Sequence, residues 1–497
     1  MTIELDRFSR PSAVYREFLK KKLQLRHDGG FTPTFIPDQL FDFQKFLVEW
    51  AVKRGRGAVF ADCGLGKSFQ ALAWAENVVR HTNKPVLILT PLAVAHQFVT
   101  EGAKFGIECC RSSDGKYAAK IVATNYQRLH YFNSADFAGV VCDESSILKN
   151  FDGSTKAAVT EFMRLIPYRL LCTATAAPND FVELGTSSEA LGELGFQDMV
   201  TKFFRKETAK DYLGWGRTKY LLRTHAERDF WRWVCSWARA CRKPSDLGFD
   251  DGKYILPPLT INEFVVEAKQ KRAGHLFDVP AQDQRELQEE RRRTVGERCE
   301  KAAELVNGTG QPAVVWCHLN DEGDLLERLI PDSVQVSGSD DDDAKEERLD
   351  AFARGQIRVL VTKPKIAQFG LNLQVCAHAV YFPSDSFESW YQSIRRCWRF
   401  GQTRPVVADV IASEGQAGVR ANLQRKQDKC ETMFRNLIAL MNEHLQIKLD
   451  DRFTKKASVP TWLCGTSSAA AVPNGSGNGK PRRARGTEKT DEAVESK

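Results

Sequence analysis

The sequence lacks any run approaching the roughly 20 consecutive apolar residues that a helix needs to cross a bilayer. Its first ten residues are largely polar, where a secretory signal peptide needs an apolar stretch. We therefore expect a protein that is neither secreted nor embedded in a membrane.

Signals for metal binding and for disulfides are also missing. The 13 cysteines contain no Cys-x-x-Cys pair, and His225, His275 and His318 have no partners at the spacing of metal ligands. Several cysteines, such as Cys142 and Cys172, stand inside apolar runs, where they behave as small buried hydrophobic residues. This usage fits a reducing compartment and disfavours a structural zinc site.

The length and the net charge of the chain limit the kinds of protein that it can be. Its 497 residues are more than one hydrophobic core usually organises, so we expect two domains or more rather than one small binding module. The net charge is +7, but residues 452–497 hold nine basic and four acidic residues, which leaves only +2 for the rest of the chain. A nucleic-acid partner is compatible with this charge but is not demonstrated by it.

Short apolar and β-branched runs recur along the chain, separated by longer stretches with helical periodicity. This alternation is typical of parallel strands that helices cover on both faces, so we predict an α/β fold. The runs form two sets with a gap between them, which indicates two α/β domains. The first set is 58–61, 85–90, 120–124, 139–142 and 169–172, and the second is 313–317, 334–337, 357–362, 377–382 and 406–411.

A candidate phosphate-binding loop, Ala-Asp-Cys-Gly-Leu-Gly-Lys-Ser at 61–68, follows the first apolar run and opens a predicted helix. Its glycines would let backbone N–H groups approach phosphate oxygens at the positive end of that helix. The strict pattern has glycine at position 61, where this chain has alanine, and an ordinary glycine-rich turn is the alternative. The predicted nucleotide contacts are Gly64, Leu65, Gly66, Lys67, which would reach the β and γ phosphates, and Ser68, which would hold Mg²⁺.

Two carboxylates stand at the end of a later apolar run. Asp143 and Glu144 follow the predicted strand 139–142, and open α/β sheets bind their ligands at the carboxyl ends of their strands. Asp143 could hold Mg²⁺ through water, and Glu144 could polarise the attacking water. A solvated acidic turn is the alternative, which the loop at 61–68 disfavours.

With these two motifs in place, the chain resembles the superfamily 2 helicases, and among them the Snf2-like ATPases of the compact phage and bacterial type, from about Gln39 to Ser413. The resemblance implies two recA-like domains with an ATP cleft between them. It also implies that Gln44, in the segment Leu-Phe-Asp-Phe-Gln at 40–44, contacts adenine, since a glutamine amide offers both a donor and an acceptor. The DEAD/DEAH-like acidic box departs from many relatives in ending with Ser145 and Ser146.

Several further segments match motifs that the family lays along nucleic acid or uses to couple nucleic acid to ATP. Phosphate-backbone contacts of this kind need hydroxyls and backbone amides more than charge. The residues that the resemblance assigns to nucleic acid are Pro91, Thr124, Asn125, Tyr126, Thr173, Thr175, Gly370 and Asn372, and Gly370 is also assigned to the nucleotide.

The strongest motif of the second half is Gln-Ser-Ile-Arg-Arg-Cys-Trp-Arg-Phe-Gly-Gln at 392–402. Arg396 and Arg399 are three apart, so on a helix they share one face and both can point across a cleft. Guanidinium groups there would neutralise charge that develops on the transferred phosphoryl group. An exposed basic helix is the alternative.

The resemblance and the composition together predict five segments. These are an N-terminal extension at 1–37, an ATP-binding recA-like domain at 38–228, a helical or linker insertion at 229–300, a second recA-like domain at 301–453 and a disordered basic tail at 454–497. Within the insertion, we interpret Trp231, Trp233 and Trp237 as core residues rather than as a base-stacking platform.

We therefore expect an ATP hydrolase that uses ATP and Mg²⁺ to move along DNA, with double-stranded DNA favoured because the second-half motifs look Snf2-like. The alternatives are an RNA or single-strand unwinding helicase, and a nucleotide-gated nucleic-acid-binding protein without turnover. The expected location is the cytoplasm of a bacterial or phage-infected cell. The sequence indicates no particular protein partner.

Overall fold

The structure, a computed structural model, describes residues 29–91, 94–149, 153–210, 216–269, 284–367 and 372–445. The predicted tail at 454–497, the first 28 residues of the predicted N-terminal extension, and Gly370 lie outside the described residues. None of the described helices is long and apolar enough to span a bilayer.

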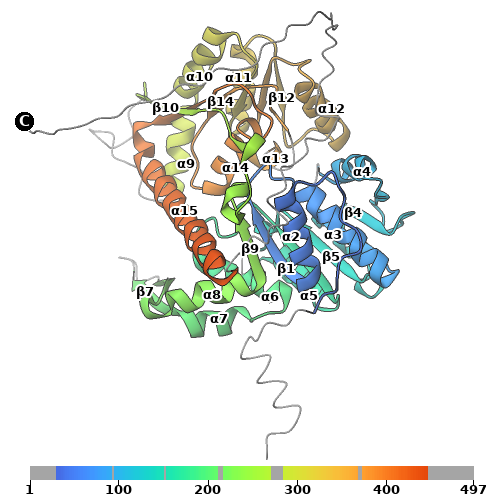
Figure 1. The fold of residues 1–497 in the computed structure, drawn as a ribbon. Helices are drawn as coiled ribbons and strands as arrows, with labels where there is room; N and C mark the ends of the chain where they lie inside the picture. The colour runs from blue at the N-terminus through green and yellow to red at the C-terminus, as the bar shows by residue number, and fades with distance from the viewer. Residues whose placement is uncertain are drawn as a thin grey trace, which may run out of the picture. The chain divides into compact units, whose positions relative to one another are not determined.

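Seven parallel strands form the first sheet, in the order β3-β4-β2-β5-β6-β1-β9 (Figure 1). Most of these strands are buried along their whole length, as the continuous apolar runs predict for a sheet covered on both faces. The bounds are β1 Arg56–Ala61, β2 Val86–Thr90, β3 Cys109–Arg111, β4 Ile121–Asn125, β5 Gly139–Asp143, β6 Tyr168–Cys172 and β9 Ala238–Cys241.

Helices connect these strands, and one antiparallel hairpin lies in the chain between the last two of these helices. The helices are α2 Asp42–Arg54, α3 Lys67–Thr82, α4 Ala95–Lys104, α5 Ser154–Arg164, α6 Leu184–Leu191, α7 Phe196–Phe203 and α8 Glu227–Trp237, and the hairpin is β7 Phe204–Lys210 with β8 Gly216–Leu222. We call this sheet and its helices the first lobe.

Six parallel strands form the second sheet, in the order β10-β15-β14-β11-β13-β12. The strands are β10 Leu259–Val266, β11 Ala313–Trp316, β12 Ser333–Val336, β13 Val359–Thr362, β14 His378–Tyr381 and β15 Val406–Ser413. The helices are α9 Gln284–Arg293, α10 Val295–Thr309, α11 Asn320–Leu329, α12 Asp342–Ala353, α13 Pro364–Ala367 and α14 Phe387–Cys397. This is the second lobe, and the two parallel α/β sheets confirm the predicted fold class.

The segment predicted as an insertion contributes a strand to each sheet. Strand β9 pairs with β1 at the edge of the first sheet, and β10 pairs with β15 at the edge of the second. Both strands carry weak sequence signals, because β9 is only four residues long and β10 alternates between half-buried and exposed positions. Trp231, Trp233 and Trp237 are buried in the core of the first lobe, which confirms their interpretation as core residues.

Helix α15 (Ala417–Leu445) follows the last strand of the second sheet and runs beside α8 of the first lobe (Figure 1). The thiol of Cys235 in α8 donates to the carbonyl oxygen of Leu437 at 3.7 Å, and the amide of Ala240 in β9 donates to the sulfur of Met441 at 3.3 Å. Apolar residues of α15 complete the first-lobe core, namely Cys430, Met433, Phe434, Leu437 and Met441. The chain therefore returns to its first lobe after building the second.

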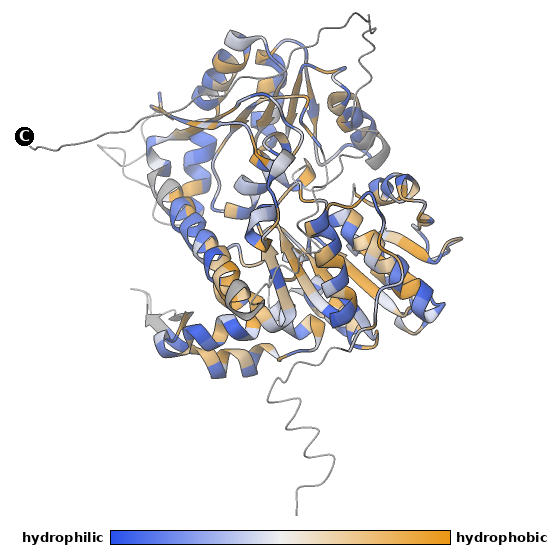
Figure 2. Cartoon of the chain, in the orientation of Figure 1, coloured by the Kyte–Doolittle hydropathy of each residue, from blue (hydrophilic) through white to orange (hydrophobic). Residues whose placement is uncertain are grey.

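The apolar residues of both sheets lie between layers of helices whose outer faces are polar (Figure 2). Burial of that apolar surface is the main favourable term for each lobe. The strand ends that carry the sequence motifs are thereby fixed by the core beneath them.

One ion pair inside the second lobe joins α10 to α11. The Arg298 guanidinium donates from Nη1 to Oε1 of Glu322 at 2.6 Å, and both side chains are buried. The other oxygen of Glu322 accepts from the backbone amides of His318 at 2.7 Å and Leu319 at 3.0 Å. Each charged group thus has partners on several atoms, which a buried charge requires.

We expect Arg298→Met to lower the free energy of unfolding by about 3–5 kcal/mol, because it leaves the Glu322 carboxylate buried without its cation. Adding Glu322→Gln should recover much of the loss, since a glutamine can still accept from the two backbone amides. Urea denaturation of the three proteins measures this. Equal stability of Arg298→Met and the unaltered chain would contradict it.

Candidate active site

The loop at 61–68 lies between β1 and α3, in the order that the sequence predicts. Gly64 and Gly66 have φ angles of +86° and +77°, which glycine adopts at little cost. A Cβ on Gly66 would lie 2.3 Å from Nε2 of Gln44, and a Cβ on Gly64 would lie 3.0 Å from the backbone nitrogen of Phe400. Both glycines are therefore required by backbone conformation and by the close approach of a neighbour.

Lys67 begins α3, and its ammonium group lies against the loop itself. Nζ donates to the carbonyl oxygens of Ala61 at 2.9 Å and Asp62 at 3.2 Å. Ser68 follows it in the first turn of the helix. A carboxylate from α4, Glu101, lies beside Ser68, and burial raises the pKa of that carboxyl.

The two predicted acids lie at the end of β5, two strands away from β1 in the same sheet. Asp143 and Glu144 are both buried. Burial raises the pKa of the Asp143 carboxyl to about 7, the charge of Glu144 adds to the rise, and the ammonium of Lys67 opposes it. Sheet order thus brings the lysine and the acids together, because the carboxyl ends of parallel strands share one edge.

Glu144 has a backbone conformation that is rare for a residue other than glycine. Its φ is +53°, in the left-handed region, which a side chain occupies only when its surroundings hold it there. Oε1 accepts from the hydroxyls of Thr173 at 2.6 Å and Ser146 at 3.2 Å. Among the described residues, none donates a hydrogen bond to Oε2. One oxygen is therefore held, and the other can accept from a water molecule.

Gln44 contacts the loop directly. Its amide nitrogen donates to the carbonyl oxygen of Leu65 at 2.9 Å, and its amide oxygen accepts from the backbone nitrogen of Phe41 at 3.0 Å. Aromatic rings lie close by: Tyr254 and Phe400 stack with centroids 4.4 Å apart, and the ring of Phe41 meets that of Tyr254 edge-on at 5.3 Å. The predicted adenine contact is thus placed beside apolar rings and the loop.

Helix α14 of the second lobe lies against the loop of the first. Arg395 donates from Nη2 to Oδ2 of Asp62 at 2.5 Å and to the carbonyl oxygen of Cys63 at 3.2 Å. The hydroxyl of Tyr391 donates to Oδ1 of Asp62 at 2.6 Å. The Arg395 and Asp62 side chains are buried, so this is a dry ion pair between the lobes.

Arg396 lies in the last turn of α14, whereas Arg399 follows the end of that helix, so the expectation that both lie on one helix is wrong for Arg399. Arg396 donates from Nη2 to Oε1 of Gln392 at 2.8 Å, and the same oxygen accepts from the thiol of Cys63 at 3.3 Å. A Cβ on Gly64 would lie 3.6 Å from the Cβ of Arg399. Burial, together with the charge of Arg396, lowers the pKa of Arg399 to about 10.

Sequence reasoning missed the residues that join the lobes, Asp62, Tyr391 and Arg395, as well as Glu101. Asp62 lies within the loop motif and Arg395 is next to Arg396, so both residues belong to motifs that the sequence shows. What the sequence could not show is that an acid in one lobe meets a base 333 positions later in the chain.

Five of the residues assigned to nucleic acid have buried side chains, namely Thr124, Asn125, Tyr126, Thr173 and Thr175. Thr124 donates to the carbonyl oxygen of Ser112 at 2.8 Å, and the hydroxyl of Tyr126 donates to that of Asp143 at 2.7 Å. Pro91 is half-buried and Asn372 is exposed. The roles of these residues in binding nucleic acid stay predictions.

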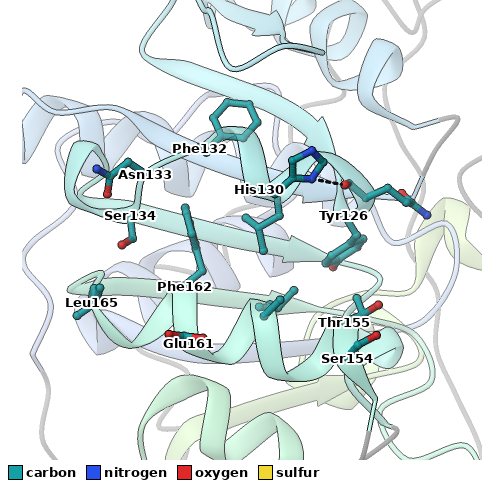
Figure 3. A pocket seen from close by; sticks show the side chains of 14 residues that line it. Tyr126, His130, Phe132, Asn133, Ser134, Ser154, Thr155, Glu161, Phe162 and Leu165 are labelled. Carbon is teal, nitrogen blue, oxygen red and sulfur yellow. Dashed lines mark hydrogen bonds between the residues drawn. The ribbon is translucent and has the colours of Figure 1, made fainter.

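A separate cavity of about 650 Å³ lies between the 3₁₀ helix at Tyr126–Tyr131 and α5 (Figure 3). Phe132, Phe162 and Leu165 line it together with polar groups such as His130, whose Nδ1 is 2.9 Å from the carbonyl oxygen of Gln127. No residue of the loop 61–68 lines this cavity. It is therefore distinct from the candidate active site.

The residues at the loop fit a magnesium ion. The Asp143 carboxyl lies close enough to the Lys67 ammonium for that charge to lower its pKa, and Mg²⁺ is usually held by one or two carboxylates together with phosphate oxygens. Within the described ranges, no three His, Cys, Asp or Glu side chains gather into a cage that could hold a metal by protein ligands alone.

No protein-family model matches the chain, and no curated protein matches it in sequence. Among solved structures, the SWI2/SNF2 ATPase core of Sulfolobus solfataricus in complex with dsDNA is 16% identical, with a TM-score of 0.39, over 86% of this chain and 99% of that chain. At this identity and TM-score the similarity carries no argument about activity or partners.

We expect Arg395→Met to speed amide hydrogen exchange in the loop 61–66 and in α14, because the Asp62 carboxylate is then buried without its cation. Adding Asp62→Asn should restore slow exchange in part. As a matched control, Arg354→Met removes an exposed pair with Asp350 and should leave both segments unchanged. Exchange equal to that of the unaltered chain in Arg395→Met would contradict the role of this ion pair.

Proposed function

We propose that the chain is a nucleic-acid-stimulated ATPase that couples hydrolysis to movement along DNA, with double-stranded DNA as the preferred track. The observation that carries the proposal is the convergence at one loop of Lys67, Asp143 and Glu144 from one lobe with Arg396 and Arg399 from the other. A lysine, two acids and arginines around a glycine-rich loop can bind and cleave a nucleoside triphosphate.

Each of these residues has a part in the proposed hydrolysis. Lys67 and the amides of the loop bind the β and γ phosphates, and Ser68 and Asp143 hold Mg²⁺. When bound, that ion neutralises charge on the phosphate oxygens. Glu144 accepts a proton from the attacking water at Oε2, while the two hydroxyls on Oε1 fix the direction of the carboxylate. Arg396 and Arg399 stabilise the charge that develops on the transferred group.

Gln44 and the rings beside it are proposed to receive the adenine base. The amide of Gln44 lies against the loop and can exchange its partners Leu65 and Phe41 for the edge of the base. Phe41, Tyr254 and Phe400 provide apolar surface at the same point. These rings come from both lobes and from the segment between them, so base binding would depend on how the lobes meet.

Movement follows from the division of the site between lobes. Hydrolysis requires both lobes at one nucleotide, so each cycle of binding and release would close and open them. If each lobe holds the nucleic-acid backbone in turn, the protein advances, largely independently of base sequence because phosphate contacts do not read bases. An RNA or single-strand helicase, and a nucleotide-gated binding protein without turnover, remain the alternatives.

The choice of track is tested by measuring ATP hydrolysis with duplex DNA, single-stranded DNA and RNA at one salt concentration. We expect duplex DNA to stimulate the rate most. Stimulation by RNA alone would overturn the DNA assignment, and strand separation of a forked substrate would favour the unwinding alternative.

The catalytic assignment is tested with Glu144→Gln, which keeps the hydrogen bonds on Oε1 but removes the base. We expect the hydrolysis rate to fall by about 10²–10⁴-fold while ATP still binds. Glu161→Gln, at an exposed position of α5, is the control and should hydrolyse ATP normally. A rate for Glu144→Gln equal to that of the unaltered chain would show that this residue is not the base.

A further inference from the structure

Glu388, in the first turn of α14, is a buried carboxylate of the second lobe that lies against the first lobe. It forms an ion pair with the ammonium of Lys149, and its Oε1 accepts from the hydroxyl of Thr175 at 3.4 Å. Both of these partners belong to segments that contact Glu144, the proposed general base. Glu388 is not one of the nucleotide contacts proposed above, so its burial at this contact needs another explanation.

The first of the two segments is the 3₁₀ turn Ser145–Lys149, which directly follows Glu144. At its beginning, the hydroxyl of Ser146 donates to Oε1 of Glu144, and the amide of Ile147 donates to the carbonyl oxygen of Glu144 at 3.3 Å. At its end, Lys149 is paired with Glu388. A five-residue turn that is held at both ends has little freedom, so the ion pair restricts where Ser146 can lie.

The second segment is Thr173–Thr175, after β6. The hydroxyl of Thr173 donates to Oε1 of Glu144 at 2.6 Å and accepts from the backbone nitrogen of Thr175 at 3.0 Å. The side chain of Thr175 then reaches Glu388. Three hydrogen bonds, the first two linked through Thr175 itself, therefore connect the second lobe to the same carboxylate oxygen that Ser146 contacts.

We infer that Glu388 is a positioning residue for hydrolysis: by holding Lys149 and Thr175 together it fixes Oε1 of Glu144 and leaves Oε2 directed at the attacking water. This inference rests on the proposed ATPase function. The left-handed φ of Glu144 supports it, because such a conformation persists only when several contacts impose it. The proposed general base of one lobe, Glu144, is then fully positioned only when α14 of the other lobe is docked.

The arrangement gives α14 two tasks at once. Its carboxyl end and the residues just after it bring Arg396 and Arg399 to the loop, and Glu388 at its amino end holds two residues that position Glu144, the proposed base. Lobe closure would thus supply the charge-stabilising groups and the oriented base in one movement. With the lobes open, hydrolysis would be slow because the arginines are absent from the loop and Glu144 is not held in position. ATP would therefore be hydrolysed mainly when the lobes close.

The test measures steady-state hydrolysis with saturating duplex DNA, or the best stimulating polymer, for Glu388→Gln and Glu388→Ala. We expect kcat to fall about 10–100-fold for the alanine variant and less for the glutamine variant, which can still accept from Thr175. KM for ATP and the affinity for a fluorescent ATP analogue should stay within about threefold, because the loop contacts are intact. A purely structural defect would instead lower binding as well.

Two further variants separate positioning from general loosening of the lobes. Lys429→Gln breaks another ion pair between α15 and the first lobe, to Asp180 at 2.8 Å, and should leave kcat unchanged. Thr173→Val removes the hydroxyl on Oε1, and its combination with Glu388→Ala should lose less than the product of the two single losses.

A kcat within about twofold of the unaltered chain for both Glu388 variants would overturn the inference, as would fully multiplicative losses with Thr173→Val. If the alanine variant does not fold, the near-isosteric glutamine variant and the Thr173→Val combination made with it decide the question. If the unaltered chain hydrolyses no ATP with any polymer, the proposed function itself fails, which is a different result from equal rates among active variants.

Discussion

The docking of α14 on the loop 61–68 is the contact on which the rest of the candidate site depends. Arg395 and Asp62 form a buried ion pair that only this docking provides, and either charge left alone in that dry environment would be strongly unfavourable. The geometry of the pair therefore restricts how the lobes can meet. With Arg395 on Asp62, the residues that follow place Phe400 so close to Gly64 that a Cβ there would lie 3.0 Å from the backbone nitrogen of Phe400.

Charge balance at the loop follows from the same contact. Burial raises the pKa of the Asp143 carboxyl, the charge of Glu144 raises it further, and the Lys67 ammonium offsets this rise only in part. Three arginines lie near the loop as well, Arg395 and Arg396 in α14 and Arg399 just after it, and burial disfavours the charge of Arg399. Acids of the first lobe and arginines of the second thus lie close to the same loop.

Buried hydroxyl groups form hydrogen bonds with the acidic residues of this site. Thr173 and Thr175 have buried side chains that hydrogen-bond towards Glu144 and Glu388, and Tyr126 donates to the backbone at Asp143. Motif segments that follow the strands therefore connect the acid, the adjacent strands and the second lobe through short polar contacts.

The sequence by itself determined the two sheets and the loop. Continuous apolar runs predict buried parallel strands because a strand covered on both faces must be apolar at every position, and the ten predicted runs all overlap observed strands. The loop and the acidic pair could be found because their chemistry needs particular residues at particular local spacings, with Gly64, Gly66, Lys67 and Asp143 as examples.

Only the tertiary structure decided how the lobes share one site. Strands β3, β9 and β10 were not predicted, because short or alternating edge strands have little local signal. Three contacts join residues that are hundreds of positions apart in the chain. Helix α15 packs on the first lobe, Asp62 pairs with Arg395, and Glu388 contacts Lys149 and Thr175. The packing of whole lobes decides which side chains meet when they are so far apart in the sequence. A local pattern in a single sequence does not predict such a pair.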